Sequence, residues 1–97
     1  MTPNQTMGTP MPASSVTVSY TGTAGTTTAM PANANVVRVV ATTDCFIEIT
    51  SAGTAAVADT GMFLPANSPE YFACPPLAKV SAIQYSTAGS IKVTPFN

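Results

Sequence analysis

The amino-acid sequence predicts an all-β protein, a small antiparallel β-sandwich or barrel with an extended N-terminal arm. Short apolar runs rich in β-branched residues recur along the chain, and several of them alternate strictly with polar residues. Gly, Pro, Asn and Asp mark the turns between these runs, and no segment has helical spacing over about ten residues. The 97 residues make one domain, so we expect an arm at 1–15 and a single β domain at 16–97.

The predicted arm contains three prolines, three methionines and no charged residue. Its prolines argue against a helix, and a free chain of this composition buries too little apolar surface to fold alone. Two interpretations remain open, a frayed terminus and an arm that becomes ordered against a neighbouring subunit. In the second interpretation Met7 and Met11 are candidate partner contacts, because methionine offers an adaptable apolar surface.

The β domain begins with an alternating segment at 16–21. In this segment Val16, Val18 and Tyr20 are separated by polar residues, a pattern that predicts a half-buried strand. A turn containing two glycines follows, and we expect residues 26–30 to form a short return strand.

Residues 35–50 predict a β-hairpin, because two apolar runs rich in β-branched residues flank the polar triplet 42–44. A three-residue loop at 42–44 would set Arg38 across from Glu48 and leave the other face fully apolar. A slip of one residue would mix the two faces, so the pattern favours this register. The apolar face carries Val37, Val39, Ala41, Cys45, Ile47 and Ile49. We expect this hairpin to lie at the centre of the core.

The chain after this hairpin predicts two short strands, at 60–64 and at 70–73, with a Pro-containing turn between them. Tyr71 and Phe72 are consecutive in the second strand and therefore point to opposite faces. One of them is expected in the core and the other on a partner, although a two-layer fold could also bury both. Phe96 near the C-terminus could likewise cover the core or contact a neighbour, so all three aromatic residues are candidate partner contacts.

The last predicted hairpin joins residues 80–85 to residues 90–94 around a Gly-containing turn. The apolar pattern leaves two registers open. One pairs Ile83 and Tyr85 with Ile91 and Val93, and the other groups Val80 and Ala82 with the same two residues.

We find no residues that would carry catalysis. The chain has no His, no glycine-rich phosphate loop and no nucleophile elbow. Asp44 and Glu48 would lie about 13 Å apart along the chain, farther than a glycosidase pair of carboxylates. Two cysteines without His give no metal-site pattern, and we expect Cys45 and Cys74 to be free thiols in a reducing cytoplasm. We therefore predict that the protein is not an enzyme and uses no cofactor, metal or small-molecule substrate.

Charge excludes two further classes of partner. Only seven residues are charged and the net charge is −1, so there is no basic footprint for nucleic acid or an anionic membrane. No apolar run approaches the roughly 18 residues of a membrane span, and the N-terminus lacks the features of a signal peptide. We expect synthesis in the cytoplasm. The scarcity of charge predicts a surface that is partly covered in the working state, the alternative being a polar, Thr-rich surface.

Four segments carry a resemblance to a known family. They are Val-Val-Arg-Val-Val-Ala-Thr-Thr-Asp-Cys-Phe-Ile-Glu-Ile (36–49), Met-Phe-Leu-Pro-Ala-Asn-Ser-Pro-Glu-Tyr-Phe (62–72), Lys-Val-Ser-Ala-Ile-Gln-Tyr (79–85) and Ile-Lys-Val-Thr (91–94). In this succession the chain resembles the small all-β virion proteins of tailed bacteriophages. The resemblance covers residues 36–94, and its motifs are structural rather than catalytic.

This resemblance implies a capsid decoration, or cement, subunit on the virion surface. Such a subunit bridges neighbouring copies of the major capsid protein, and it is a homo-oligomer, often a trimer. Some similar proteins are instead neck or tail components of the phage, which is the second interpretation. A carbohydrate-binding or adhesin module is an alternative from another class; it would need an aromatic platform for stacking sugars, and the absence of Trp counts against it.

Deleting residues 1–15 tests the role of the arm. We expect the truncated chain to fold, because the predicted core strands begin at residue 16, and to bind more weakly to undecorated phage shells. The measurement is a titration of full-length and truncated protein onto shells, with bound protein read from gel bands after sedimentation. Equal occupancy at every concentration would leave only the frayed terminus.

Overall fold

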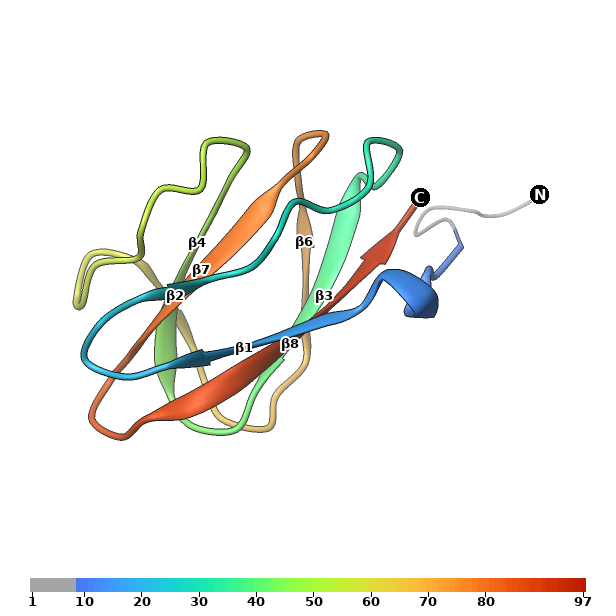
Figure 1. Cartoon of the computed structure of the whole chain (residues 1–97). Coiled ribbons are helices and arrows are strands. Elements are labelled where there is room, and N and C mark those ends of the chain that lie inside the picture. Colours follow the sequence, from blue (N-terminus) through green and yellow to red (C-terminus); the bar gives the residue numbers. More distant parts are fainter. Residues whose placement is uncertain (1–8) are drawn as a thin grey trace.

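The computed structural model describes residues 9–97, which contain eight β-strands and one short 3-10 helix. In chain order the elements are η1 (Pro12–Ser14), β1 (Val16–Tyr20), β2 (Gly25–Thr26), β3 (Val36–Ala41), β4 (Cys45–Thr50), β5 (Met62–Leu64), β6 (Glu70–Ala73), β7 (Lys79–Gln84) and β8 (Gly89–Phe96). The predicted all-β fold class is confirmed (Figure 1).

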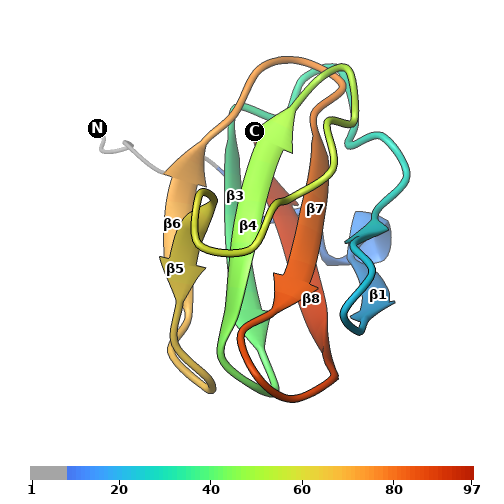
Figure 2. The same cartoon turned by 90° about the vertical axis from the view of Figure 1, so that its left-hand side faces the viewer.

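The strands form two antiparallel sheets that pack face to face. One sheet has the order β1-β8-β3-β6, and the other has the order β2-β7-β4-β5. Figure 2 looks onto the second sheet, with the first sheet behind it. The protein is therefore a sandwich rather than a closed barrel, and each sheet has one face in the core and one outer face.

The strand pairing shows how the chain is wound. β1 pairs with β8, β2 with β7, β3 with β6 and β4 with β5, all antiparallel. The chain is thus one long antiparallel ribbon that turns back in the loop between β4 and β5. Rolling up this ribbon brings β3 beside β8 and β4 beside β7. This winding of eight strands into two sheets is that of a jelly roll.

The predicted hairpin of residues 35–50 is wrong in its pairing, although both of its strands are present. β3 and β4 lie in different sheets, and residues 42–44, the β3–β4 crossing, lead from one sheet to the other. Both strands have one fully apolar face. That face can be buried beside its neighbour in one sheet or opposite it across a sandwich, and alternation alone does not distinguish the two arrangements.

The expected pair of Arg38 and Glu48 is consequently absent from the structure. Arg38 lies beside Tyr71 on one side and Thr94 on the other, whereas Glu48 lies beside Ser81 in the opposite sheet. Both charged side chains are half-buried on outer faces, as the alternation predicted. The face of each residue was predicted correctly, and the neighbour was not.

The second predicted hairpin is wrong for the same reason. β7 and β8 lie in different sheets, and residues 85–88, the β7–β8 crossing, join them. Neither of the two registers considered for a hairpin occurs. The second of them nevertheless grouped the right side chains, because Val80, Ala82, Ile91 and Val93 are all fully buried and face one another across the sandwich.

The core lies between the sheets and is made of apolar side chains from every strand except β2 and β6. Five of the six residues predicted for the apolar face of 35–50 are buried in it, and Ile49 packs against them. The remaining members of the core are Tyr20, Met30, Ala34, Leu64, Ala78, Val80, Ala82, Ile91 and Val93. At about 25 cal/mol per Å² of apolar surface, this burial is the main term that stabilises the fold.

The two crossings lie side by side at one end of the sandwich and are hydrogen bonded to each other. The Thr42 N–H donates to the Ser90 carbonyl at 3.0 Å, and the Ser90 N–H donates to Thr42 Oγ1 at 3.0 Å. Thr43 Oγ1 donates to the Thr87 carbonyl at 3.0 Å. Threonine side chains thus form hydrogen bonds with backbone groups that have no strand partner where the chain passes from one sheet to the other.

Tyr20, the last residue of β1, closes the core at this end. Its side chain is 1% exposed, and its hydroxyl lies 2.8 Å from both the carbonyl oxygen and Oγ1 of Thr43. Gly89 leaves room for this group: a Cβ atom at that position would overlap the hydroxyls of Thr42, Thr43 and Tyr20. Tyr20 thereby links the first strand to the β3–β4 crossing, and Thr43 Oγ1 in turn links that crossing to the β7–β8 crossing.

Two strands are shorter than the sequence predicted. β2 is confined to Gly25 and Thr26 instead of residues 26–30, and β5 occupies only the end of the predicted strand at 60–64. At Gly25 the chain lies so close to β1 that a Cβ atom would overlap the Ser19 carbonyl. This close approach brings the edges of the two sheets together.

The described part of the predicted arm lies along β8 of the same chain. The Thr9 N–H donates to the Asn97 carbonyl at 3.2 Å, and the Asn97 N–H donates to the Thr9 carbonyl at 3.0 Å. The Met11 N–H donates to the Pro95 carbonyl at 2.8 Å. These residues extend the β1 edge of their sheet.

Replacing Tyr20 with Phe should lower the free energy of unfolding by about 1–3 kcal/mol, because the Thr43 carbonyl and hydroxyl lose a partner inside the structure. Tyr85→Phe is the matched control. Its side chain is 58% exposed, so loss of the hydroxyl should change the free energy by less than about 0.5 kcal/mol. Urea unfolding followed by circular dichroism measures both variants. Equal effects would contradict the role assigned to Tyr20.

Candidate functional site

Residues 9–97 contain no cluster of three or more His, Cys, Asp or Glu side chains and enclose no pocket. In the same range, no helix is long and apolar enough to cross a membrane. The same range does expose aromatic rings, among other apolar side chains. Exposed rings lie on the outer faces of both sheets, and we describe the two surfaces in turn.

The outer face of the β2-β7-β4-β5 sheet, in front in Figure 2, carries three aromatic rings in mutual contact. Phe46 on β4 lies beside Phe63 on β5 and beside Ile83 on β7, and Tyr85 follows β7 directly. The ring centroids of Phe46, Phe63 and Tyr85 are 5.7, 5.8 and 5.7 Å apart in the three pairs. We call Phe46, Phe63, Ile83 and Tyr85 the Phe63 face.

The three rings of the Phe63 face differ in exposure. Phe46 is 7% exposed because the other rings and Gly61 pack against it, whereas Phe63 is 47% exposed. Inclined aromatic pairs of this kind contribute about 0.5–1.5 kcal/mol beyond area burial. The cluster is therefore anchored by one covered ring while its outer rings stay in water. Such a surface is typical of the apolar patches that protein partners cover.

The outer face of the β1-β8-β3-β6 sheet carries a second aromatic contact. Tyr71 on β6 meets Phe96 on β8 edge to face, with ring centroids 5.7 Å apart and planes inclined by 66°. Arg38 on β3 lies between those strands, beside Tyr71 and Thr94. Lys92 alternates with two core residues of β8 and therefore points outward. We call Val36, Arg38, Val40, Tyr71, Lys92 and Phe96 the Tyr71 face.

The structure brings together only two of the five predicted partner contacts. Tyr71 is 48% exposed and lies against the half-buried Phe96, so the two share one surface. Phe72 and Met11 instead pack against the core of their own chain. Met7 lies outside the described residues. The docking of the arm on a neighbouring subunit stays a prediction.

Sequence reasoning missed the Phe63 face as a unit. Phe46 was expected as part of the second strand of the 35–50 hairpin, and Tyr85 was paired with apolar residues in one of the two registers left open for the last hairpin. They meet because β4 has β5 on one side and β7 on the other, and these neighbours come from distant parts of the chain. The sequence did contain one indication of this face. Phe46, Ile83 and Phe63 are each next to an apolar residue that faces the core, so alternation would place all three on the outer face.

The two cysteines are free thiols, as predicted. Burial raises the pKa of the Cys45 thiol and of the Cys74 thiol, and it also raises the pKa of the Tyr20 hydroxyl. Their ordinary values are 9.0 for Cys and 10.0 for Tyr. Because each folded-state pKa is raised, these groups contribute stability that is complete below the unfolded pKa and is lost as the pH rises through the folded pKa. The folded state should therefore lose stability above about pH 9.

Comparison with known proteins finds no family model that matches the chain, no similar curated protein and no similar solved structure.

The raised pKa values predict slow thiol chemistry in the folded state. At pH 8 the native protein should react with a thiol-specific disulfide reagent at least about tenfold more slowly than the protein in urea, since the thiolate is the reacting form. A Cys74→Ser variant isolates buried Cys45, which should react more slowly than half-buried Cys74 in the Cys45→Ser variant. Equal rates with and without urea would contradict this prediction.

Proposed function

We propose that the chain is a structural subunit of a tailed-phage virion that decorates the capsid and holds neighbouring major capsid proteins together. The observation that supports this best is the pair of exposed aromatic surfaces, the Phe63 face and the Tyr71 face, on opposite sides of the sandwich. A subunit that bridges neighbours needs two contact surfaces. Tyr and Phe side chains of this kind are enriched in protein interfaces.

Composition and fold support the proposal in a general way. The few charges leave a surface on which apolar contact dominates, and covering such a surface favours binding at about 25 cal/mol per Å² before the cost of association is subtracted. Jelly rolls are common in viral capsid domains and also in lectins. That second argument is one of fold analogy, so the residues of the two faces carry more weight.

The action of such a subunit is mechanical. Each copy would contribute its outer faces to contacts, and several copies held together would engage several capsid proteins at once. Linking contacts in this way raises the overall affinity without any new type of interaction. The bound subunits would then add buried surface that resists the internal pressure of packaged DNA.

A neck or tail component of the same virion is the second interpretation, because the same surfaces would serve there. The number of copies per particle separates the two positions. Copies comparable in number to the major capsid protein would place the subunit on the shell, and far fewer would place it at the neck or tail.

Carbohydrate binding is favoured by one observation, the aromatic cluster of the Phe63 face. A sugar ring stacks on a flat platform, however, and the three rings are inclined to one another by 65°, 46° and 78°. The cluster therefore fits an apolar protein surface better than a sugar. A panel of immobilised glycans distinguishes a sugar site from a protein surface. A sugar site on the Phe63 face should give glycan binding that Phe63→Ser abolishes, whereas a protein surface should give no glycan binding.

Phe63→Ser tests the proposed function directly. Titrated onto undecorated shells, this variant should need at least about tenfold more protein for half occupancy, because it removes an exposed anchor of the contact surface. Leu77→Ser is the matched control, since Leu77 is 52% exposed but lies in the loop between β6 and β7. Unchanged occupancy for Phe63→Ser, or no binding of the parent protein to shells, would contradict the proposal.

A further inference from the structure

We infer that copies of this chain join head to tail, the Tyr71 face of one copy covering the Phe63 face of the next. The inference deepens the proposed function and rests on it for the role of the oligomer. In a ring or row each copy gives its two aromatic faces to neighbouring copies, and the oligomer as a whole engages several capsid proteins. The contact itself concerns the purified chain alone, so it stands or falls without the virion.

Both faces present the same kind of apolar anchor. On each face an exposed ring, Phe63 or Tyr71, leans edge to face against a more covered ring, Phe46 or Phe96. Two such clusters can continue the edge-to-face pattern across an interface. Both clusters lie on outer faces of the sheets, so one can meet the other without entering a pocket. The loop between β4 and β5 covers the part of that sheet beside the Phe63 cluster, because its Ala56 N–H donates to Ser81 Oγ.

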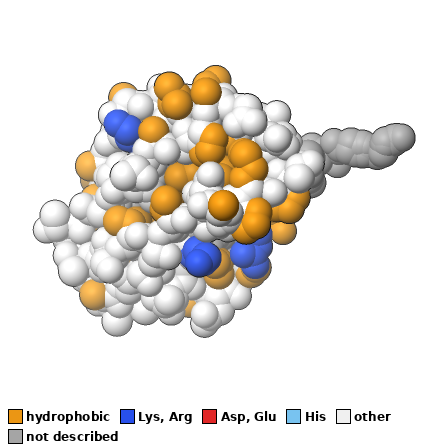
Figure 3. All heavy atoms as spheres, turned by 45° about the vertical axis from the view of Figure 1, so that its right-hand side comes forward, with side chains coloured by type: hydrophobic (Ala, Val, Ile, Leu, Met, Phe, Trp, Pro, Cys, Tyr) orange, Lys and Arg blue, Asp and Glu red, His pale blue; other side chains and the backbone are white. Residues whose placement is uncertain are grey.

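Charge selects which faces meet. The Tyr71 face has the cations Arg38 and Lys92, and none of the four carboxylates of the chain lies on that outer face. Figure 3 is turned part of the way toward this side, and no Asp or Glu side chain is in view there. Glu70, on the edge strand β6, lies in register with core-facing Val39 and so belongs to the other side of that sheet.

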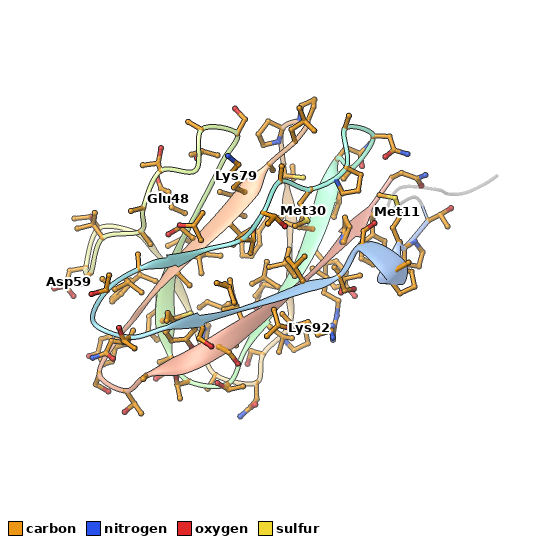
Figure 4. The ribbon with its side chains drawn as sticks, viewed as in Figure 1. Met11, Met30, Glu48, Asp59, Lys79 and Lys92 are labelled. Carbon is orange, nitrogen blue, oxygen red and sulfur yellow. The ribbon has the colours of Figure 1, made fainter. Side chains whose placement is uncertain are left out.

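The charges near the Phe63 face are mainly negative. Glu48 lies on the same side of β4 as Phe46, and Asp59 is exposed in the loop between β4 and β5. Figure 4 shows both carboxylates on the side away from Lys92. Lys79 also points outward from this sheet, because it alternates with the core residue Val80, and its Cδ lies near Gly53 of the same loop. This side therefore carries two carboxylates and one cation, whereas the Tyr71 face carries two cations and no carboxylate.

Symmetric pairing is disfavoured by the same charges. A two-fold contact between two Tyr71 faces would bring four cations together with no carboxylate. A two-fold contact between two Phe63 faces would bring together four carboxylates and two cations, which is an excess of negative charge. An excess of like charges in an interface disfavours that contact. A contact between unlike faces joins opposite charges instead. It leaves one free face at each end, so the copies close into a ring or continue as a row.

Two single-face variants and their mixture test this arrangement. In purified protein, measured by size-exclusion chromatography with light scattering, the parent chain should exceed the 9.9 kDa of one copy. Tyr71→Asp should disable one face, because it removes a ring and repels the carboxylates opposite, and Phe63→Ser should disable the other. Each variant alone should be a single copy. Mixed in equal amounts, they should form a complex of one copy of each, because each supplies the face that the other has lost.

The controls separate this result from misfolding and from other contacts. Leu77→Ser should assemble like the parent chain, and circular dichroism should show that all variants keep the parent β spectrum. Raising the salt concentration should weaken assembly, because opposite charges contribute to it. A parent chain that stays a single copy at every concentration would overturn the inference. So would a variant that still pairs with itself, or a mixture without a mixed complex. Absence of binding to shells would overturn the proposed function and leave this result untouched.

Discussion

The hydrogen bonds of the Tyr20 hydroxyl to Thr43 hold together the end of the sandwich on which the winding of the chain depends. Four connections change sheets at this end, at residues 21–24, 42–44, 65–69 and 85–88. Asp44 binds the connection at residues 65–69, since its carboxylate accepts the Ala66 N–H at 2.8 Å. A chain that changes sheet so often leaves backbone groups unpaired at every crossing. Here the side chains of Thr, Tyr and Asp satisfy those groups, so the crossings are fixed relative to one another.

The faces of the strands were predictable from the sequence, and their neighbours were not. Val37, Val39 and Ile47 were expected in the core and are buried there. Alternation has a period of two and says which side a residue takes. It does not say whether two consecutive strands lie side by side or face each other across the core. The short loop 42–44 allows both arrangements, and the deciding interactions come from β6, β7 and β8, far away in the sequence.

The same holds for the candidate surfaces: the face of a residue could be predicted, and its neighbours could not. Tyr71 was recognised because its neighbour Phe72 had to point the other way, and this local argument needs no knowledge of pairing. The Phe63 face required knowing that β5 and β7 flank β4, so its three rings were seen singly or not at all. Met11 was assigned to a partner on composition, but its backbone pairs with β8 and its side chain packs on the core. Composition identifies apolar side chains that are expected to be buried. Only the pairing of the strands shows whether they are buried in their own chain or against a partner.

The antiparallel pairing of β1 with β8 has a consequence for how the domain carries load. Thr9 and Asn97 are hydrogen bonded to each other, so both ends of the described chain leave the sandwich at the same point. Tension applied between those ends would open the β1–β8 ladder like a zipper, breaking its perpendicular hydrogen bonds one after another. Force directed through the two outer faces would instead press the sheets together, so that it acts on the packed core and not along the hydrogen bonds, which lie in the planes of the sheets. The fold therefore resists compression across its sheets better than tension between these two ends.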